Sequence, residues 1–140
     1  MATVIRPELS VKNKYWIDKH RYYELKHFCK QYSSWKKTYA ALNEMGMSAT
    51  TIDSIPSNNS SHGDLTAKYA IRKASYAEKI KMVEKAAKES DQDLYIYILK
   101  AVTEDLSYTY LKSKLNIPCG RDMYYDRYRR FFWLLSESRN

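Results

Sequence analysis

The chain has 140 residues, of which 44% are hydrophobic, and it carries a formal net charge of +8 at pH 7. This length suits one domain, or one domain with a helical extension, and the apolar share is enough for a core. The chain contains only three Gly and three Pro, which argues against a strand-and-turn architecture and for an all-α fold. The charge favours an anionic partner, most often nucleic acid, over the alternative that lysines merely coat solvated helix faces.

The two cysteines, Cys29 and Cys119, occupy unrelated contexts. We therefore expect no disulfide framework, and a reducing cytoplasm fits the chain better. No apolar run is long enough to span a membrane, and no signal-peptide pattern follows Met1. The sequence predicts a cytoplasmic protein without a membrane partner.

Residues 1–45 predict an N-terminal arm followed by a basic helical hairpin. Residues 1–13 lack helical periodicity, whereas 15–31 repeat apolar side chains at steps of three and four residues. That stripe consists of Trp16 or Ile17, Tyr22 (or Tyr23), Leu25, Phe28 and Cys29. Ser33 or Ser34 is placed to cap a second short helix, whose apolar face carries Trp35, Tyr39 and Leu42.

Much of the positive charge lies in this hairpin, because residues 12–37 contain eight Lys or Arg and only two acidic residues. One interpretation is a second surface that contacts phosphates. The other is an element for dimerisation or partner docking, which displays Trp16 and Trp35.

Residues 46–63 predict a flexible Ser/Thr/Asn linker, since few of them are apolar enough to offset the entropy of ordering. Residues 64–140 then form the predicted C-terminal domain. Asp64 is placed to cap a long helix that reaches about Glu89, with one apolar stripe formed by Leu65, Tyr69, Tyr76, Ile80, Val83 and Ala87. Ser90 is the expected N-cap of the next helix, supported by Asp93.

The segment 94–135 has the pattern of a helix-turn-helix. A helix over 94–102 buries Leu94, Ile98, Ala101 and Val102, and a short helix over 108–115 repeats Leu111 and Leu115 after the cap Ser107. Ile117 is placed to fill the turn, and Gly120 is expected to supply an unusual backbone angle. The last helix, 121–135, aligns Tyr124, Tyr128, Phe131 and Leu135, with Leu134 beside them. A short helix, a turn with Gly and Pro, and a longer Arg-rich helix are typical of a module whose second helix enters the major groove of DNA.

This pattern assigns DNA contacts to the outer faces of the last two helices. Recognition helices contact bases through their first turns and phosphates further along. We expect base contacts from Arg121, Asp122, Tyr125 and Arg129, and phosphate contacts from Arg127, Arg130, Lys112 and Lys114. The alternative is an ordinary amphipathic helix with a solvated basic face.

Neither metal binding nor catalysis is expected. His20, His27 and Cys29 match no tetrahedral zinc spacing. The chain has no Gly-rich phosphate loop, nucleophile elbow or paired-histidine motif. Asp91 and Asp93 fit helix-start residues better than an acid–base pair. The sequence therefore predicts a protein that is not an enzyme and has no cofactor.

The order of these elements resembles the RinA/ArpU-type transcriptional regulators of phages and prophages of Gram-positive bacteria. The resemblance covers most of the chain and rests on Tyr22-Tyr23-Glu24-Leu25, Gln31-Tyr32-Ser33-Ser34-Trp35, the polar linker, the helix over 70–88 and above all the segment 108–135. It implies a C-terminal module similar to region 4 of bacterial sigma factors, activation of late phage genes, and a place in the cytoplasm of a bacterial host. The turn 117–122 lacks the Ser-Arg-Arg-like opening that such modules often have.

Double-stranded DNA is therefore the expected partner, and RNA polymerase and a second copy of the chain are further candidates. Two other hypotheses remain open. The excess of Tyr and Trp suits a phage-encoded helical protein that binds and modulates a host protein. A helix-turn-helix also suits a DNA-packaging factor of the small-terminase kind.

Overall fold

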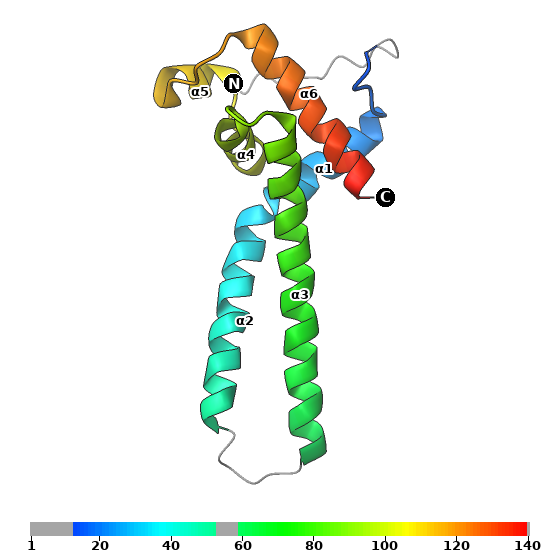
Figure 1. Ribbon diagram of the computed structural model, residues 1–140, viewed down its shortest axis with the longest axis vertical. Coiled ribbons are helices and arrows are strands. Elements are labelled where there is room, and N and C mark those ends of the chain that lie inside the picture. Colours follow the sequence, from blue (N-terminus) through cyan, green and yellow to red (C-terminus); the bar gives the residue numbers. More distant parts are fainter. Residues whose placement is uncertain (1–12, 53–58, 140) are drawn as a thin grey trace. The chain divides into compact units, whose positions relative to one another are not determined.

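A computed structural model describes residues 13–52 and 59–139 of the chain. These residues form six α-helices and no strand, so the predicted all-α class is confirmed for this part of the chain (Figure 1). The helices are α1 (Lys19–Lys30), α2 (Tyr32–Ile52), α3 (Asn59–Ser90), α4 (Tyr95–Glu104), α5 (Tyr108–Leu115) and α6 (Arg121–Ser138). No helix in the described ranges is long and apolar enough to cross a membrane.

The chain divides into two compact units. The first unit consists of Met1–Tyr32 and Met82–Asn140, and the second unit is Ser33–Lys81. The unit boundaries fall within α3 and at the start of α2.

The first unit is built on α1, α4 and α6, each of which packs against the other two. The apolar stripes predicted for these helices are buried, including Leu25 on α1, Ile98 on α4 and Phe131 on α6. Phe132, outside the predicted stripe, is buried as well. Helix α6 begins at Arg121 as expected but continues to Ser138, three residues further than predicted.

Tyrosine rings form the centre of this core. Tyr22, Tyr124 and Tyr128 are all below 7% exposed, and the Tyr22 and Tyr128 hydroxyls lie 2.8 Å apart in a hydrogen bond. The rings of Tyr22 and Phe132 meet edge to face with centroids 5.1 Å apart. The buried hydroxyl of Tyr124 has no hydrogen-bond partner among the described residues. Burial raises the pKa of Tyr22 to about 12, because the core disfavours the charged phenolate.

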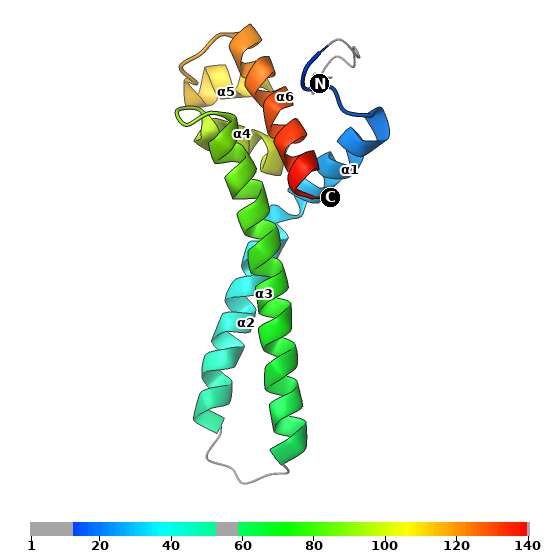
Figure 2. The same cartoon turned by 45° about the vertical axis from the view of Figure 1, so that its right-hand side comes forward.

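The second unit pairs α2 with the first part of α3, and the two helices run antiparallel side by side (Figures 1 and 2). Trp35 and Leu42 are its buried apolar residues on α2, as their spacing predicts. Across the pair, the Lys73 ammonium donates to Asn43 Oδ1 at 2.5 Å, and Lys79 lies over the Trp35 ring at 5.9 Å from its centroid. On α3, Leu65 and Ile71 are 47% and 69% exposed, so Leu65 does not join the expected stripe.

This arrangement corrects the predicted basic hairpin. The sequence suggested that the first two helices pair with each other, whereas α1 packs on α4 and α6 and α2 pairs with α3. An apolar stripe indicates that one face of a helix is buried, but it does not indicate which other helix covers that face.

The predicted linker over 46–63 is also corrected at both ends. Helix α2 continues to Ile52 and α3 begins at Asn59, so Gly46, Gly63 and Asp64 lie inside helices, and Asp64 is not an N-cap. An isolated Gly costs a helix about 1 kcal/mol, and Ser, Thr and Asn cost less, so such residues do not end a helix by themselves. The remainder of the expected linker, 53–58, lies outside the described residues, as does most of the expected N-terminal arm.

Candidate nucleic-acid interface

Helix α5 and the turn after it are fixed at both ends. Ser107 is the N-cap, as predicted, and its hydroxyl accepts a hydrogen bond from the Tyr110 amide at 3.2 Å. The Tyr108 hydroxyl donates to the Cys119 carbonyl at 2.7 Å and so ties the first residue of α5 to the far end of the turn. Ile117 is fully buried, as expected for an apolar residue in this turn. The turn therefore holds α5 and α6 in a defined geometry.

The unusual backbone angle of this turn lies at Asn116 and not at Gly120. Asn116 is the C-cap of α5 and adopts the left-handed conformation with φ 53°, and its amide bonds to the Leu111 carbonyl. Gly120 has an ordinary φ of −80°, so the prediction for Gly120 was wrong. Asn tolerates the left-handed region because its short side chain bonds locally, and it is a common alternative to Gly at helix ends.

Gly120 instead acts as the N-cap of α6 without a side chain. Within the part of the chain that the structure describes, no side-chain hydrogen bond caps this helix start. The first amides of an α-helix have no partner within the helix and, with the helix dipole, attract anions. The start of α6 is thus open to an anionic group, although Asp122 in its first turn supplies some negative charge.

Arg121 is exposed at this helix start and is positioned by two tyrosines. Its guanidinium donates to the Tyr125 hydroxyl at 3.0 Å and lies 5.0 Å from the centre of the Tyr108 ring. A cation stacked on aromatic rings keeps its outward donors free while its orientation is restricted. Of the four predicted base-contacting residues, the structure brings Arg121, Asp122 and Tyr125 together in the first turns of α6.

The two predicted lysines of α5 form a second group of exposed cations. Lys112 and Lys114 are exposed, and among the described residues neither forms an ion pair. Helix α5 contains no acidic residue. Its charge is therefore available to an external anion.

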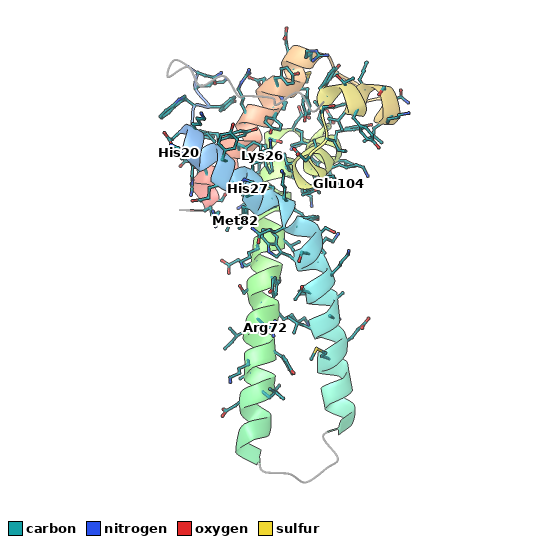
Figure 3. All side chains as sticks on the ribbon, turned by 180° about the vertical axis from the view of Figure 1, so that it is seen from behind. His20, Lys26, His27, Arg72, Met82 and Glu104 are labelled. Atoms are coloured by element: carbon teal, nitrogen blue, oxygen red, sulfur yellow. The ribbon has the colours of Figure 1, made fainter. Side chains whose placement is uncertain are left out.

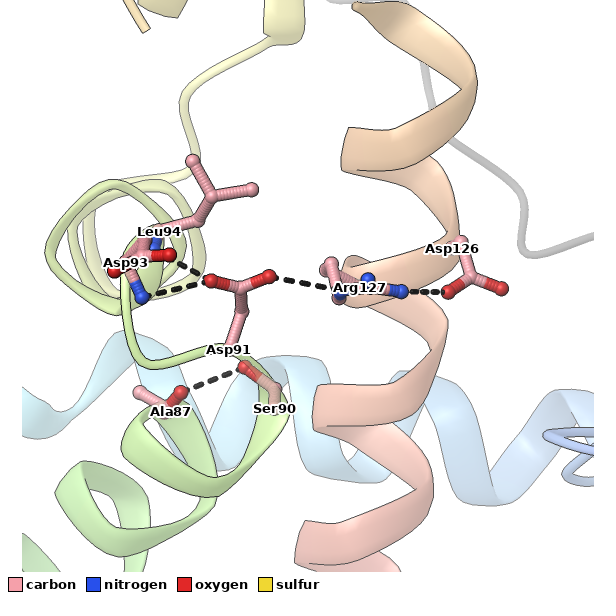
Figure 4. Close-up of polar contacts among 7 residues, drawn as sticks. All are labelled: Ala87, Ser90, Asp91, Asp93, Leu94, Asp126 and Arg127. Atoms are coloured by element: carbon pink, nitrogen blue, oxygen red, sulfur yellow. Dashed lines mark hydrogen bonds and ion pairs between the residues drawn. The ribbon is translucent and has the colours of Figure 1, made fainter. Parts of the chain in front are cut away.

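Arg127 is engaged inside the protein, which the sequence did not indicate (Figure 4). Its Nε donates to Asp91 Oδ2 at 2.8 Å and its Nη1 to Asp126 Oδ2 at 2.5 Å. The same Asp91 accepts the amides of Asp93 and Leu94 at 2.8 and 2.9 Å, and so ties α6 to the turn between α3 and α4. The predicted phosphate contact of Arg127 remains a prediction, but this guanidinium already has two carboxylate partners.

Asp91, and not Ser90, supplies the polar cap at this turn. The Ser90 hydroxyl donates backwards to the Ala87 carbonyl at 2.6 Å, so the predicted capping role of Ser90 was wrong (Figure 4). Ser90 is buried at the end of α3, and a buried hydroxyl needs a hydrogen-bond partner nearby, which the Ala87 carbonyl supplies. Burial opposes ionisation of Asp91, but the hydrogen bonds from Arg127 and two backbone amides outweigh it and lower the pKa of the carboxyl group.

The last two predicted arginines are consecutive residues in the middle of α6. Arg129 is half-buried, and its Nε is buried with no hydrogen-bond partner among the described residues. Arg130 is half-buried and lines a cavity together with residues of α3 and α4. Neither side chain is brought to the cluster around Arg121.

The basic surface of α1 is partly neutralised. His20, Lys26 and His27 lie along this helix (Figure 3). Lys26 and Lys30 both approach the Asp105 carboxylate, at 3.7 and 3.3 Å. These contacts leave the concentrated charge of residues 12–37 less available than the sequence suggests.

Among the described residues, no three His, Cys, Asp or Glu side chains gather in a way that could hold a metal ion. Burial raises the pKa of the Cys29 and Cys119 thiols, so neither has the lowered pKa of a reactive thiolate. Comparison of the chain with models of protein families, with curated proteins and with solved structures finds no match.

Proposed function

We propose that the protein is a sequence-specific DNA-binding regulator of transcription, and that it binds double-stranded DNA through α5, the turn 116–120 and the first turns of α6. The observation that carries the proposal is the group of unpaired cations at this place. Lys112, Lys114 and Arg121 are exposed and have no acidic partner in the described ranges, and they lie next to a helix start whose N-cap residue, Gly120, has no side chain.

The chemistry of this surface fits the two tasks of a DNA-binding module. Lysines on the short helix suit phosphates, which fix the position of a protein on the duplex but carry no sequence information. The first turn of α6 offers Arg121, which can donate two hydrogen bonds to guanine, and Asp122, which can accept one from cytosine. The Tyr125 and Tyr108 rings restrict Arg121 before DNA arrives, so less side-chain entropy is lost on binding. The role in transcription, with activation of late phage genes, rests on the resemblance to RinA/ArpU-type regulators.

The salt dependence of binding tests the proposal quantitatively. A fluorescence anisotropy titration of the full chain with random 30-base-pair duplexes would give Kd at several salt concentrations. On random duplexes, which lack a preferred guanine at a fixed position, Arg121 counts with Lys112 and Lys114 as a phosphate contact. Because each neutralised phosphate releases about 0.9 counterion, these three contacts predict a slope of about −3 in a plot of log K against log salt. No anisotropy change at low salt would refute DNA binding through this surface.

Substitutions test whether DNA binding depends on this surface or only on the overall positive charge of the protein. Lys112→Ala with Lys114→Ala should reduce the steepness of the slope by about 2. Lys100→Ala is the matched control, because Lys100 lies on α4 and pairs with Glu104 at 3.5 Å; its slope should equal that of the unmodified protein. Selection of bound duplexes from the random pool should enrich one motif, and Arg121→Ala should relax it at one base pair.

A further inference from the structure

A cavity of about 610 Å³ that is open to solvent on one side lies in the first unit, where the end of α3, the start of α4 and the second half of α6 meet. It is separate from the cluster around Arg121. Pockets for small organic ligands usually have volumes of about 300–1,000 Å³. The residues that line it are Lys88, Glu89, Gln92, Tyr95, Arg130 and Leu134.

Two cations in this cavity indicate an anionic ligand. Arg130 is half-buried and makes no hydrogen bond or ion pair among the described residues. Lys88 lies over the Tyr95 ring, 5.9 Å from its centre, and it has no carboxylate partner within the described part of the chain. An anion that bridges Arg130 and Lys88 would gain a charge-assisted hydrogen bond from each of these cations.

The remaining lining residues restrict the ligand further. Tyr95 and Leu134 offer an aromatic ring and an apolar surface against which a flat ring can pack. The Glu89 carboxylate repels a bare anion but accepts hydrogen bonds from hydroxyl or amino groups, and Gln92 can donate or accept. The ligand must therefore combine an anionic group, hydrogen-bond donors and a planar ring.

The walls of the cavity are held in place before any ligand binds. Arg127 precedes Arg130 by one helical turn on α6, and its ion pair with Asp91 fixes α6 to the turn that carries Gln92 (Figure 4). The two amide hydrogen bonds of Asp91 order the start of α4, where Tyr95 lies. A preformed site loses less free energy on binding than one that must order first.

We propose that this cavity binds a nucleoside monophosphate, with the phosphate between Arg130 and Lys88, the sugar hydroxyls at Glu89 and Gln92, and the base against Tyr95 and Leu134. The site is independent of the proposed DNA surface, with which it shares no residue among Lys112, Lys114 and Arg121. A DNA-binding protein with such a site would be open to control by a small nucleotide.

Isothermal titration of the full chain with the four ribonucleoside 5′-monophosphates, with the corresponding nucleosides and with inorganic phosphate tests the proposal. At least one monophosphate should bind at least tenfold more tightly than its nucleoside and than inorganic phosphate, because only the monophosphate uses both halves of the cavity. Arg130→Gln and Tyr95→Leu should each weaken that binding tenfold or more.

Two controls keep the result separable from DNA binding. Lys100→Ala should bind the monophosphate as the unmodified protein does, and so should the Lys112→Ala, Lys114→Ala variant even if it no longer binds DNA. Circular dichroism establishes that the Arg130→Gln and Tyr95→Leu variants are folded. The proposal is overturned if no monophosphate binds at millimolar concentration, if inorganic phosphate alone binds as tightly, or if folded Arg130→Gln binds unchanged.

Discussion

Replacing Asp91 should show how strongly α6 is anchored, because one carboxylate caps a turn and holds an arginine of another helix. The Asp91 side chain is only 11% exposed and that of Arg127 is 30% exposed, so solvent screens their contact weakly. Loss of a capping side chain costs about 1 kcal/mol. Loss of a hydrogen bond to a charged group costs about 1.5–3 kcal/mol. We therefore expect Asp91→Ala to lower the free energy of unfolding by about 2–4 kcal/mol.

Urea denaturation followed by circular dichroism at 222 nm would measure this loss, with Asp91→Asn as the matched variant. Asn keeps an oxygen for the amides of Asp93 and Leu94 but has no charge for Arg127, so it should lose about 1–2 kcal/mol less than Ala does. In a double-mutant cycle with Arg127→Met, the coupling energy of Asp91 and Arg127 should reach about 1 kcal/mol. A loss below about 0.5 kcal/mol for Asp91→Ala, or a coupling energy near zero, would show that the ion pair does not anchor α6.

The stability that Asp91 contributes should depend on pH. The pKa of Asp91 is lower in the folded protein than its usual value of 3.8, so the folded state binds a proton there less readily than the unfolded chain. Its contribution is fully present above this unfolded value and is lost as pH falls through the lower, folded pKa. The difference in stability between the unmodified protein and Asp91→Asn should therefore shrink below about pH 4. A difference that stays constant from pH 6 to pH 3 would contradict the ionic role of Asp91.

Four further substitutions test the core and the turn. Tyr124→Phe should leave the free energy of unfolding unchanged or raise it by up to about 1–3 kcal/mol, because it removes a buried hydroxyl that has no partner among the described residues. Tyr128→Phe should lower the free energy of unfolding by about 1 kcal/mol, because the hydrogen bond to Tyr22 is lost. Thermal unfolding in which Tyr124→Phe is the less stable of the two variants would disprove these roles of the two hydroxyls. Asn116→Gly should leave the stability unchanged or raise it slightly. Asn116→Val should lower the stability by about 1–2 kcal/mol, because the φ of 53° at position 116 is unfavourable for a β-branched residue. Equal stabilities of the two variants would contradict the left-handed conformation at this position.

Predictions from the sequence succeeded where the cause is local. The buried faces of α1, α4 and α6 follow from apolar residues three and four positions apart, and Ser107 is followed at once by the helix that it caps. Helix α5 was predicted with the bounds that it has. These features depend on neighbours within one or two helical turns, and such neighbours are adjacent in the sequence.

The failures have non-local or competing causes. Asp91 and Arg127 are 36 positions apart, and no local pattern states that they meet. Ser90 and Asp91 are both good caps by residue type, and the choice between them was made by burial of Ser90 at the end of α3. Gly120 was the obvious candidate for a left-handed angle, but Asn116 occupies the position directly after α5, where that angle is needed.

The ion pairs also change which part of the charge is useful for binding DNA. If each of the six predicted cations on α5 and α6 contacted a phosphate, the salt slope would be about −5. Arg127 already has two carboxylate partners, Arg130 faces a cavity, and Arg129 lies away from the Arg121 cluster. A duplex that recruited Arg127 would have to break its contact with Asp91, which costs about as much as one charged hydrogen bond yields. The cations that lie together at the proposed DNA surface are therefore those of α5 and the first residue of α6, and a measured slope near −3 rather than −5 is the quantity that separates this surface from a uniformly basic one.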